Sequence, residues 1–287
     1  MESPMSLSSL PTESPVTGRV LEFIRFEKNA TQQSARVLPI ASPDKWCAVS
    51  INPNTKGADS TTHETVDLEL LTFSPEAIEE SKWLDEAREW CERGASQTAK
   101  RPTLISLHGV DILWGQARAV IRAPQEKLLT VRKAVIEFAF VERELAGVEE
   151  AIAKGWSSLE DDAPLAYQFK EQAVSRKEAL GERFRNVVSI RARLSKLIPL
   201  AVQAAQYPPT LESQTAERLR ERTRIEDRLD VAERQLEAFE RVYDMCGQRS
   251  SDFMLARSGH ILEWIIIILL AVQTVLTVID LMPSSGT

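Results

Sequence analysis

The chain has 287 residues and a formal net charge of −7. Hydrophobic residues make up 43% and charged residues 27%, which excludes a disordered chain and a protein with several membrane spans. The negative charge disfavours a non-specific nucleic-acid coat. The three cysteines, Cys47, Cys91 and Cys246, are far apart and odd in number, which indicates a reducing compartment rather than a disulfide framework.

Residues 1–18 are rich in Ser and Pro and hold no Lys or Arg. A secretory signal needs a basic start and an apolar core, and a mitochondrial presequence needs Arg, so the segment matches neither. We therefore expect a disordered tail at 1–18.

Residues 19–123 predict a small α/β domain. His108-Gly109 is typical of a turn between two of its strands. Ser74, Pro75 and Glu76 predict a helix start, with a capping hydroxyl, a proline in the first turn and an acidic residue at the positive helix end. That helix is expected to end near Arg93. Runs rich in β-branched and aromatic residues predict strands at 19–26, 46–51, 66–73, 103–107 and 110–114.

Residues 124–259 predict a hairpin of long antiparallel helices, similar to a coiled coil. A second helix is expected to begin near Asp162, a capping residue, with Pro164 in its first turn, and to end at Tyr207-Pro208. A third is expected to open at Thr210. The apolar stripe of the first helix is Leu128, Val131, Val135, Phe138, Leu145, Val148 and Ile152, and that of the second is Leu180, Phe184, Val187, Leu194 and Ile198.

The third helix carries a heptad seam, a run of apolar residues spaced alternately by four and three positions. This spacing is typical of helices wound in a left-handed coil, but it leaves open whether the partner helix comes from the same chain or from a second copy. The seam consists of Ile225, Leu229, Ala232, Leu236, Phe239, Tyr243 and Cys246.

Residues 260–282 predict one transmembrane helix, followed by a short tail at 283–287. The uncharged run from Trp264 to Ile279 has 16 residues, which is short for a membrane span, so Leu262 and Glu263 must lie at the membrane interface. Trp264 lies where aromatic residues are enriched at the interface, and Ile265 follows it in the span. We expect a tail-anchored protein. Arg249 and Arg257 precede the span, which places the N-terminal part in the cytoplasm or matrix. A buried core helix is the alternative.

A polar stripe lies inside this span. Gln273, Thr277 and Asp280 follow at i, i+4 and i+7 and so share one helix face. Polar groups in lipid tend to face a partner helix, so we interpret the stripe as a contact between spans; a pore lining is the weaker alternative.

The sequence contains no phosphate loop, no G-x-S-x-G, no C-x-x-C and no H-E-x-x-H. We therefore expect no catalytic residues, no cofactor, no metal and no enzymatic activity. Arg185, Arg193 and Lys196 cluster loosely on one side of a helix and are the candidate patch for RNA or anionic lipid, against the simpler interpretation as a solvated face.

The end of the chain resembles the "required for meiotic nuclear division"/YagE-type family, through His260 and the run Ile261-Leu262-Glu263-Trp264 with its following isoleucines. Gln273 stands where that family often has an acidic residue. The resemblance implies an inner- or plasma-membrane protein with no known catalytic residues, whose mitochondrial relatives form oligomers and support organellar translation.

We consider two functions for this sequence. The first is a single-pass, tail-anchored scaffold or interaction module of α+β fold. It would work as a homo-oligomer with a further, unidentified protein partner, in the bacterial inner membrane or facing the mitochondrial matrix. The second is a subunit of a membrane channel or transporter, but divalent-cation channels of that design have two spans and a Gly-Met-Asn loop, which this sequence lacks.

Overall fold

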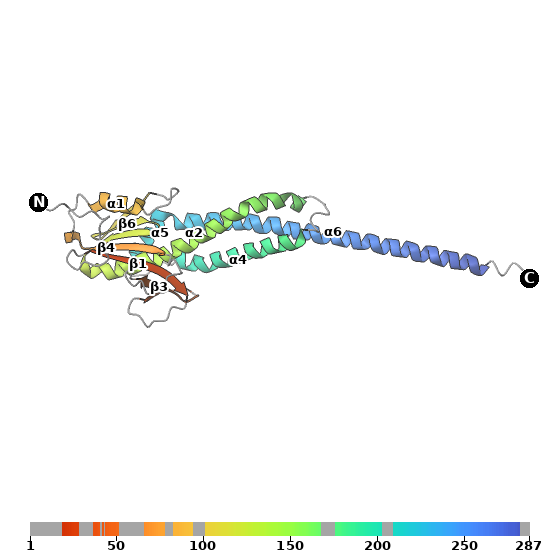
Figure 1. Ribbon diagram of the computed structural model, residues 1–287, viewed down its shortest axis with the longest axis horizontal. Coiled ribbons are helices and arrows are strands. Elements are labelled where there is room, and N and C mark those ends of the chain that lie inside the picture. Colours follow the sequence, from red (N-terminus) through yellow and green to blue (C-terminus); the bar gives the residue numbers. More distant parts are fainter. Residues whose placement is uncertain are drawn as a thin grey trace, which may run out of the picture. The chain divides into compact units, whose positions relative to one another are not determined.

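A computed structural model gives the fold, and it describes residues 19–28, 37–40, 42, 44–51, 66–77, 83–93, 101–167, 176–202 and 209–281. The α+β class is confirmed, with a mixed sheet followed by long helices (Figure 1). The predicted tails at 1–18 and 283–287 lie outside the described residues. The chain forms two compact units, residues 1–150 with 193–232, and residues 151–192 with 233–287. These units divide three of the long helices, whereas the sequence analysis placed its first domain boundary at 123.

The first unit contains a seven-stranded sheet of order β2-β3-β1-β4-β7-β6-β5. The β4·β7 pair is parallel and all other neighbours are antiparallel. All five predicted strands are present, whereas β2 and β7 are additional. The strands are β1 (Arg19–Lys28), β2 (Val37–Pro39), β3 (Trp46–Ile51), β4 (Leu68–Phe73), β5 (Thr103–Leu107), β6 (Val110–Gly115) and β7 (Arg118–Arg122).

The turn between β5 and β6 is the predicted one. His108 has φ 51° and Gly109 has φ 76°, and two consecutive residues with positive φ match the right-handed twist of a two-residue hairpin. Glycine suits the second position because it has no Cβ to strain there.

One face of the sheet packs on helix α1 (Trp83–Arg93). Its core combines Leu71 and Phe73 of β4 with Trp83 and Trp90 of α1, all buried. In place of the predicted helix from Ser74 to Arg93, the structure has a short 3₁₀ helix, η2 (Pro75–Ala77), followed by α1. Residues 78–82 between them lie outside the described residues.

The other face packs on helix α2 (Gln125–Tyr167) through contacts between aromatic rings. The ring of Phe140 lies 5.5 Å from that of Phe26 and 5.4 Å from that of Trp46, and Phe138 lies 4.9 Å from Trp114. The predicted stripe of this helix is buried from Val131 onward, while Leu128 is half-buried.

One predicted helix boundary is wrong. Helix α2 continues through Pro164 to Tyr167, so Asp162 is no cap: it is fully buried inside α2. Helix α4 (Lys177–Ala201) begins later than predicted, and the predicted helix end at Tyr207-Pro208 lies outside the described residues. A proline can lie inside a helix at the cost of one backbone hydrogen bond, which ends or bends many helices but does not end this one.

The third predicted helix begins where expected and is then interrupted. Thr210 caps α5 (Leu211–Thr223): its hydroxyl accepts from the Ser213 amide at 3.2 Å, and the Ser213 hydroxyl accepts from the Thr210 amide. Arg224 then adopts the left-handed conformation, with φ 57°, and α6 (Ile225–Leu281) follows. The heptad seam therefore belongs to α6 alone.

The buried face of α4 differs from the predicted stripe. Leu180, Val187 and Leu194 are buried as predicted, but Phe184 is 37% exposed and Ile198 is half-buried. Ile190 and Leu197 take their places in the core.

Candidate functional site

Helix α6 carries both the heptad seam and the predicted span, and the seam in its first half is buried. Every residue of the heptad seam is at most 5% exposed. The ring of Phe239 packs on Trp156 of α2, 5.0 Å between centroids. The helix-contact candidates Ile225, Leu229, Leu236 and Phe239 are thus covered within one chain.

Charged side chains beside the seam pair within the same chain. In the first unit, Arg228 donates to both oxygens of the buried Glu142 at 2.6 and 2.7 Å and to Glu149 at 2.8 Å. In the second unit, Arg191 of α4 lies 3.3 Å from Glu233 and 3.6 Å from Glu240. These ion pairs occupy the positions that interhelical charges take in a coiled coil.

The second half of α6 has the opposite character. Figure 1 shows it running on alone beyond the ends of α2 and α4 in the second unit. An 18-residue window of mean hydropathy 2.0 in this helix has no buried residue. By length and composition, this is the one helix among the described residues that could cross a membrane. We call Ile261–Thr277 the apolar end.

The predicted span residues lie as follows. Leu262 is 59%, Trp264 65% and Ile265 48% exposed. Glu263 pairs with His260 one turn earlier, 2.9 Å between carboxylate and imidazole. The side chain of Ile279 lies outside the described residues.

The polar stripe of the span is only partly described. The Thr277 hydroxyl donates to the Gln273 carbonyl at 2.8 Å, and the neighbouring Thr274 hydroxyl donates to the Leu270 carbonyl at 2.7 Å. Both hydroxyls are therefore satisfied inside the helix. Among the described residues, the side-chain amide of Gln273 has no hydrogen-bond partner. The Asp280 side chain lies outside the described residues.

The candidate anionic-partner patch is largely compensated. Lys196 contacts Asp44 at 3.0 Å, and this hydrogen bond lowers the pKa of the Asp44 carboxyl. Arg193 lies 3.6 Å from Glu144, and Arg185 donates to the Gly181 carbonyl of its own helix. Two of the three positive charges thus already face a carboxylate.

A buried polar cluster around Asp162 was missed by the sequence analysis. One Asp162 oxygen accepts from Arg183, and the Cys246 thiol contacts the Asp162 carbonyl at 3.7 Å. Burial raises the pKa of Cys246 to about 11 and also raises the pKa of Tyr243. Among the described residues, no group of three His, Cys, Asp or Glu side chains could hold a metal ion.

No family model and no curated protein matches the chain. Among solved structures, one titled "structure of the full-length CmaX protein" is similar over 88% of this chain and 82% of its own, at 13% identity and a TM-score of 0.41. At that score and identity the similarity carries no argument about function.

Proposed function

We propose that this chain is a non-enzymatic, single-pass membrane protein in which the apolar end of α6 anchors an oligomeric scaffold or interaction module. The observation that carries the proposal is the complete exposure of that apolar window. A soluble protein rarely leaves so large a continuous apolar surface in water. Lipid would bury every side of the helix at once.

The uncharged part of the helix is nearly long enough to span. Trp264 to Ile279 rises roughly 24 Å at 1.5 Å per residue, a little less than a hydrocarbon core of roughly 30 Å, so the flanking residues must lie at the interfaces. Each Ile or Leu at the centre of a span favours insertion by about 0.3 to 0.6 kcal/mol. The His260–Glu263 pair and Trp264 lie at one end, where charged and aromatic side chains meet the headgroups.

The orientation follows from the basic residues. Arg249 and Arg257 precede the apolar end, and cytoplasmic flanks are enriched in Lys and Arg. We therefore place the sheet-containing unit on the cytoplasmic or matrix side of a bacterial or mitochondrial inner membrane. A tail anchor and a role in translation or membrane-associated assembly, which the family resemblance implies, are parts of this proposal.

Self-association would use the span rather than the seam, because the seam is filled inside one chain. In lipid no hydrophobic force holds spans together, whereas a side-chain amide can supply a specific hydrogen bond of about 1 kcal/mol. Gln273 is the described span residue whose amide lacks a partner, so it is the residue that most favours a second span.

The experiment compares two double variants of the full chain in membranes. Ile267→Lys with Leu270→Lys places two charges at the centre of the apolar end, each costing about 2.5 to 3.5 kcal/mol of insertion free energy. The matched control, Ile267→Leu with Leu270→Ile, keeps the apolar surface. Alkaline extraction should release the lysine variant and leave the wild type and the control in the membrane pellet. Release of the wild type would contradict the proposal, as would retention of the lysine variant.

A further inference from the structure

A slot in the first unit lies between α2, α5 and the end of α4. Its volume is about 220 Å³. Its middle is apolar, lined by Phe138 and Val141 of α2, Leu200 of α4 and Ala216 of α5. All of these residues belong to one unit, so the slot is formed within a single compact body.

The two ends of the slot are charged. At one end, Lys133 of α2 lies 2.8 Å from Glu212 of α5 and 3.9 Å from Glu137. At the other end lies Arg220, eight residues after Glu212 on α5 and therefore roughly 12 Å further along the helix. One end of the slot thus holds a lysine that is already paired with a glutamate, and the other end holds the guanidinium of Arg220.

The two positive charges differ in how they are partnered. The hydrogen bond that Lys133 donates to Glu212 raises the pKa of Lys133, so this ammonium is firmly paired. Arg220 is half-buried, and among the described residues its guanidinium makes one hydrogen bond, to the Ala201 carbonyl at 3.4 Å. A guanidinium has five donors in a planar fork that fits a carboxylate with two parallel bonds, so most of its binding capacity is unused.

The remaining acid does not compete for Arg220. Glu137 lies at the Lys133 end, and burial raises the pKa of its carboxyl. The described walls thus carry one ammonium and two carboxylates at the Lys133 end and one guanidinium at the Arg220 end, so the positive charge that faces no described carboxylate lies at the Arg220 end.

We propose that the slot binds a small carboxylate with an apolar body, its carboxylate on Arg220 and its body against Phe138, Val141 and Ala216. The volume limits the ligand to a size below that of most drug-like molecules, such as a small aromatic or short branched acid. This site is independent of the membrane anchor.

The test uses the full chain in mild detergent and 4-fluorobenzoate as the probe, followed by fluorine NMR line broadening. 4-Fluorobenzyl alcohol carries the same ring without the charge, and inorganic phosphate carries charge without the ring. Protein-free detergent gives the background. We expect 4-fluorobenzoate to bind at least tenfold more tightly than the alcohol, and phosphate not to compete. Equal binding of acid and alcohol, or none by the acid, would overturn the proposal.

Two variants locate the site. Arg220→Gln should weaken 4-fluorobenzoate binding by roughly tenfold to hundredfold, the range expected for losing hydrogen bonds to a charged group. Its matched control is Arg218→Gln on the same helix, where the guanidinium is exposed and paired with Glu221 at 2.8 Å. Binding that is equally weakened in both variants places the probe elsewhere.

A third variant keeps the proposal testable if Arg220→Gln unfolds by losing its contact with α4. Ala216→Leu fills the middle of the slot and leaves Arg220 in place. It should abolish binding of the acid while the thermal unfolding transition is retained. Full binding by folded Ala216→Leu would overturn the assignment.

Discussion

The two halves of α6 belong to one continuous helix, yet their side chains meet different surroundings. From Ile225 to Ser250, apolar residues recur every three or four positions and are buried, while charged residues lie between them. From Ile261 to Thr277, apolar residues occupy every side of the helix and all are exposed. A stripe on one side needs a protein surface, whereas apolarity all round is typical of a helix in lipid.

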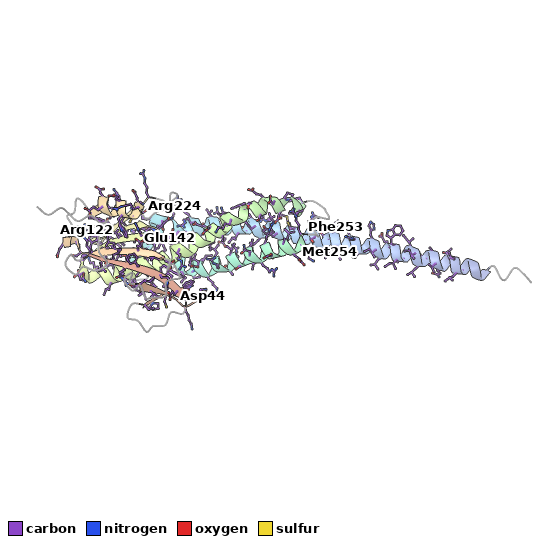
Figure 2. The ribbon with its side chains drawn as sticks, viewed as in Figure 1. Asp44, Arg122, Glu142, Arg224, Phe253 and Met254 are labelled. Carbon is purple, nitrogen blue, oxygen red and sulfur yellow. The ribbon has the colours of Figure 1, made fainter. Side chains whose placement is uncertain are left out.

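The change between the halves is abrupt. Ser250 is 1% exposed, and no residue from 251 to 277 is buried. Figure 2 labels Phe253 and Met254 at this point, where α6 leaves the other two helices of the second unit. Met254 is 41% exposed. The spacing of apolar residues therefore separates a helix that packs on protein from one that is apolar on every side, which total hydrophobicity alone does not do.

The largest expected effect comes from making the same change at the same spacing in each half. Leu229→Asp with Leu236→Asp should lower the free energy of unfolding by more than about 4 kcal/mol, because each change empties a core position and buries a carboxylate. Leu269→Asp with Leu276→Asp should change it by less than about 0.5 kcal/mol, as for surface positions. Urea unfolding in mild detergent, followed by near-ultraviolet circular dichroism, measures both.

Two outcomes of this experiment would contradict the difference between the halves of α6. If the Leu269 and Leu276 changes also unfold the sheet-containing unit, the apolar end contributes to folding rather than to anchoring. If the Leu229 and Leu236 changes leave unfolding unaltered, the seam is not the core of this fold.

A smaller effect is expected at Gly155, where α2 packs on the seam of α6. A Cβ on Gly155 of α2 would lie 2.7 Å from the Phe239 ring, which is buried against Trp156. Overpacking costs about 1 to 3 kcal/mol, and alanine regains about 1 kcal/mol of helix propensity, so Gly155→Ala should destabilise by about 1 kcal/mol.

The matched control is Gly247→Ala on α6, where a Cβ would meet nothing within 4 Å. It should stabilise by up to about 1 kcal/mol. Thermal unfolding compares the two. If the Gly155→Ala variant unfolds at a higher temperature than the Gly247→Ala variant, the Phe239 ring must be free to move, which would contradict its burial.

The smallest effect concerns the seam thiol. Burial raises the pKa of Cys246 to about 11, so at pH 8 only about one thiol in a thousand is the reactive thiolate. Ser251→Cys, five residues along at an exposed position, should react with a disulfide reagent well before Cys246 does. Prompt modification of Cys246 in the native protein would contradict its place in the core.

The same thiol gives a pH dependence of defined sign. Its folded pKa lies above the ordinary value of 9.0, so the protonated form is favoured in the folded state. The stability it contributes is complete below pH 9 and is lost as pH rises towards about 11. Replacing Cys246 with Val should reduce this alkaline loss.

Local signals predicted much of this fold. The heptad spacing identified every buried seam residue, and His108-Gly109 identified the β5–β6 turn. Strand β7 was missed because only Ala119, Val120 and Ile121 are apolar, between two arginines. The partners of those arginines lie on other strands: Arg118 pairs with Glu69 of β4 at 2.7 Å, and Arg122 with Asp111 of β6 at 3.0 Å.

The wrong predictions share a cause. Asp162 followed by Pro164 is a sound cap signal, but the side chain is instead buried beside Arg183 and Cys246, which lie 21 and 84 positions away. The helix is interrupted at Arg224, although no glycine or proline lies there to predict the break. The slot could not be predicted at all, since its walls come from segments between Ile40 and Arg220.

The single parallel joint in the sheet has a consequence for how the chain folds. Strands β1 to β4 form one antiparallel block and β5 to β7 another, and only β4·β7 connects them. The β5–β7 block closes through pairings between residues 3 to 11 positions apart, whereas β1·β4 joins residues 44 to 54 positions apart and the β4·β7 joint residues 49 apart. Loop closure over such a distance is slow, so these two pairings, which both use β4, are expected to limit the folding rate.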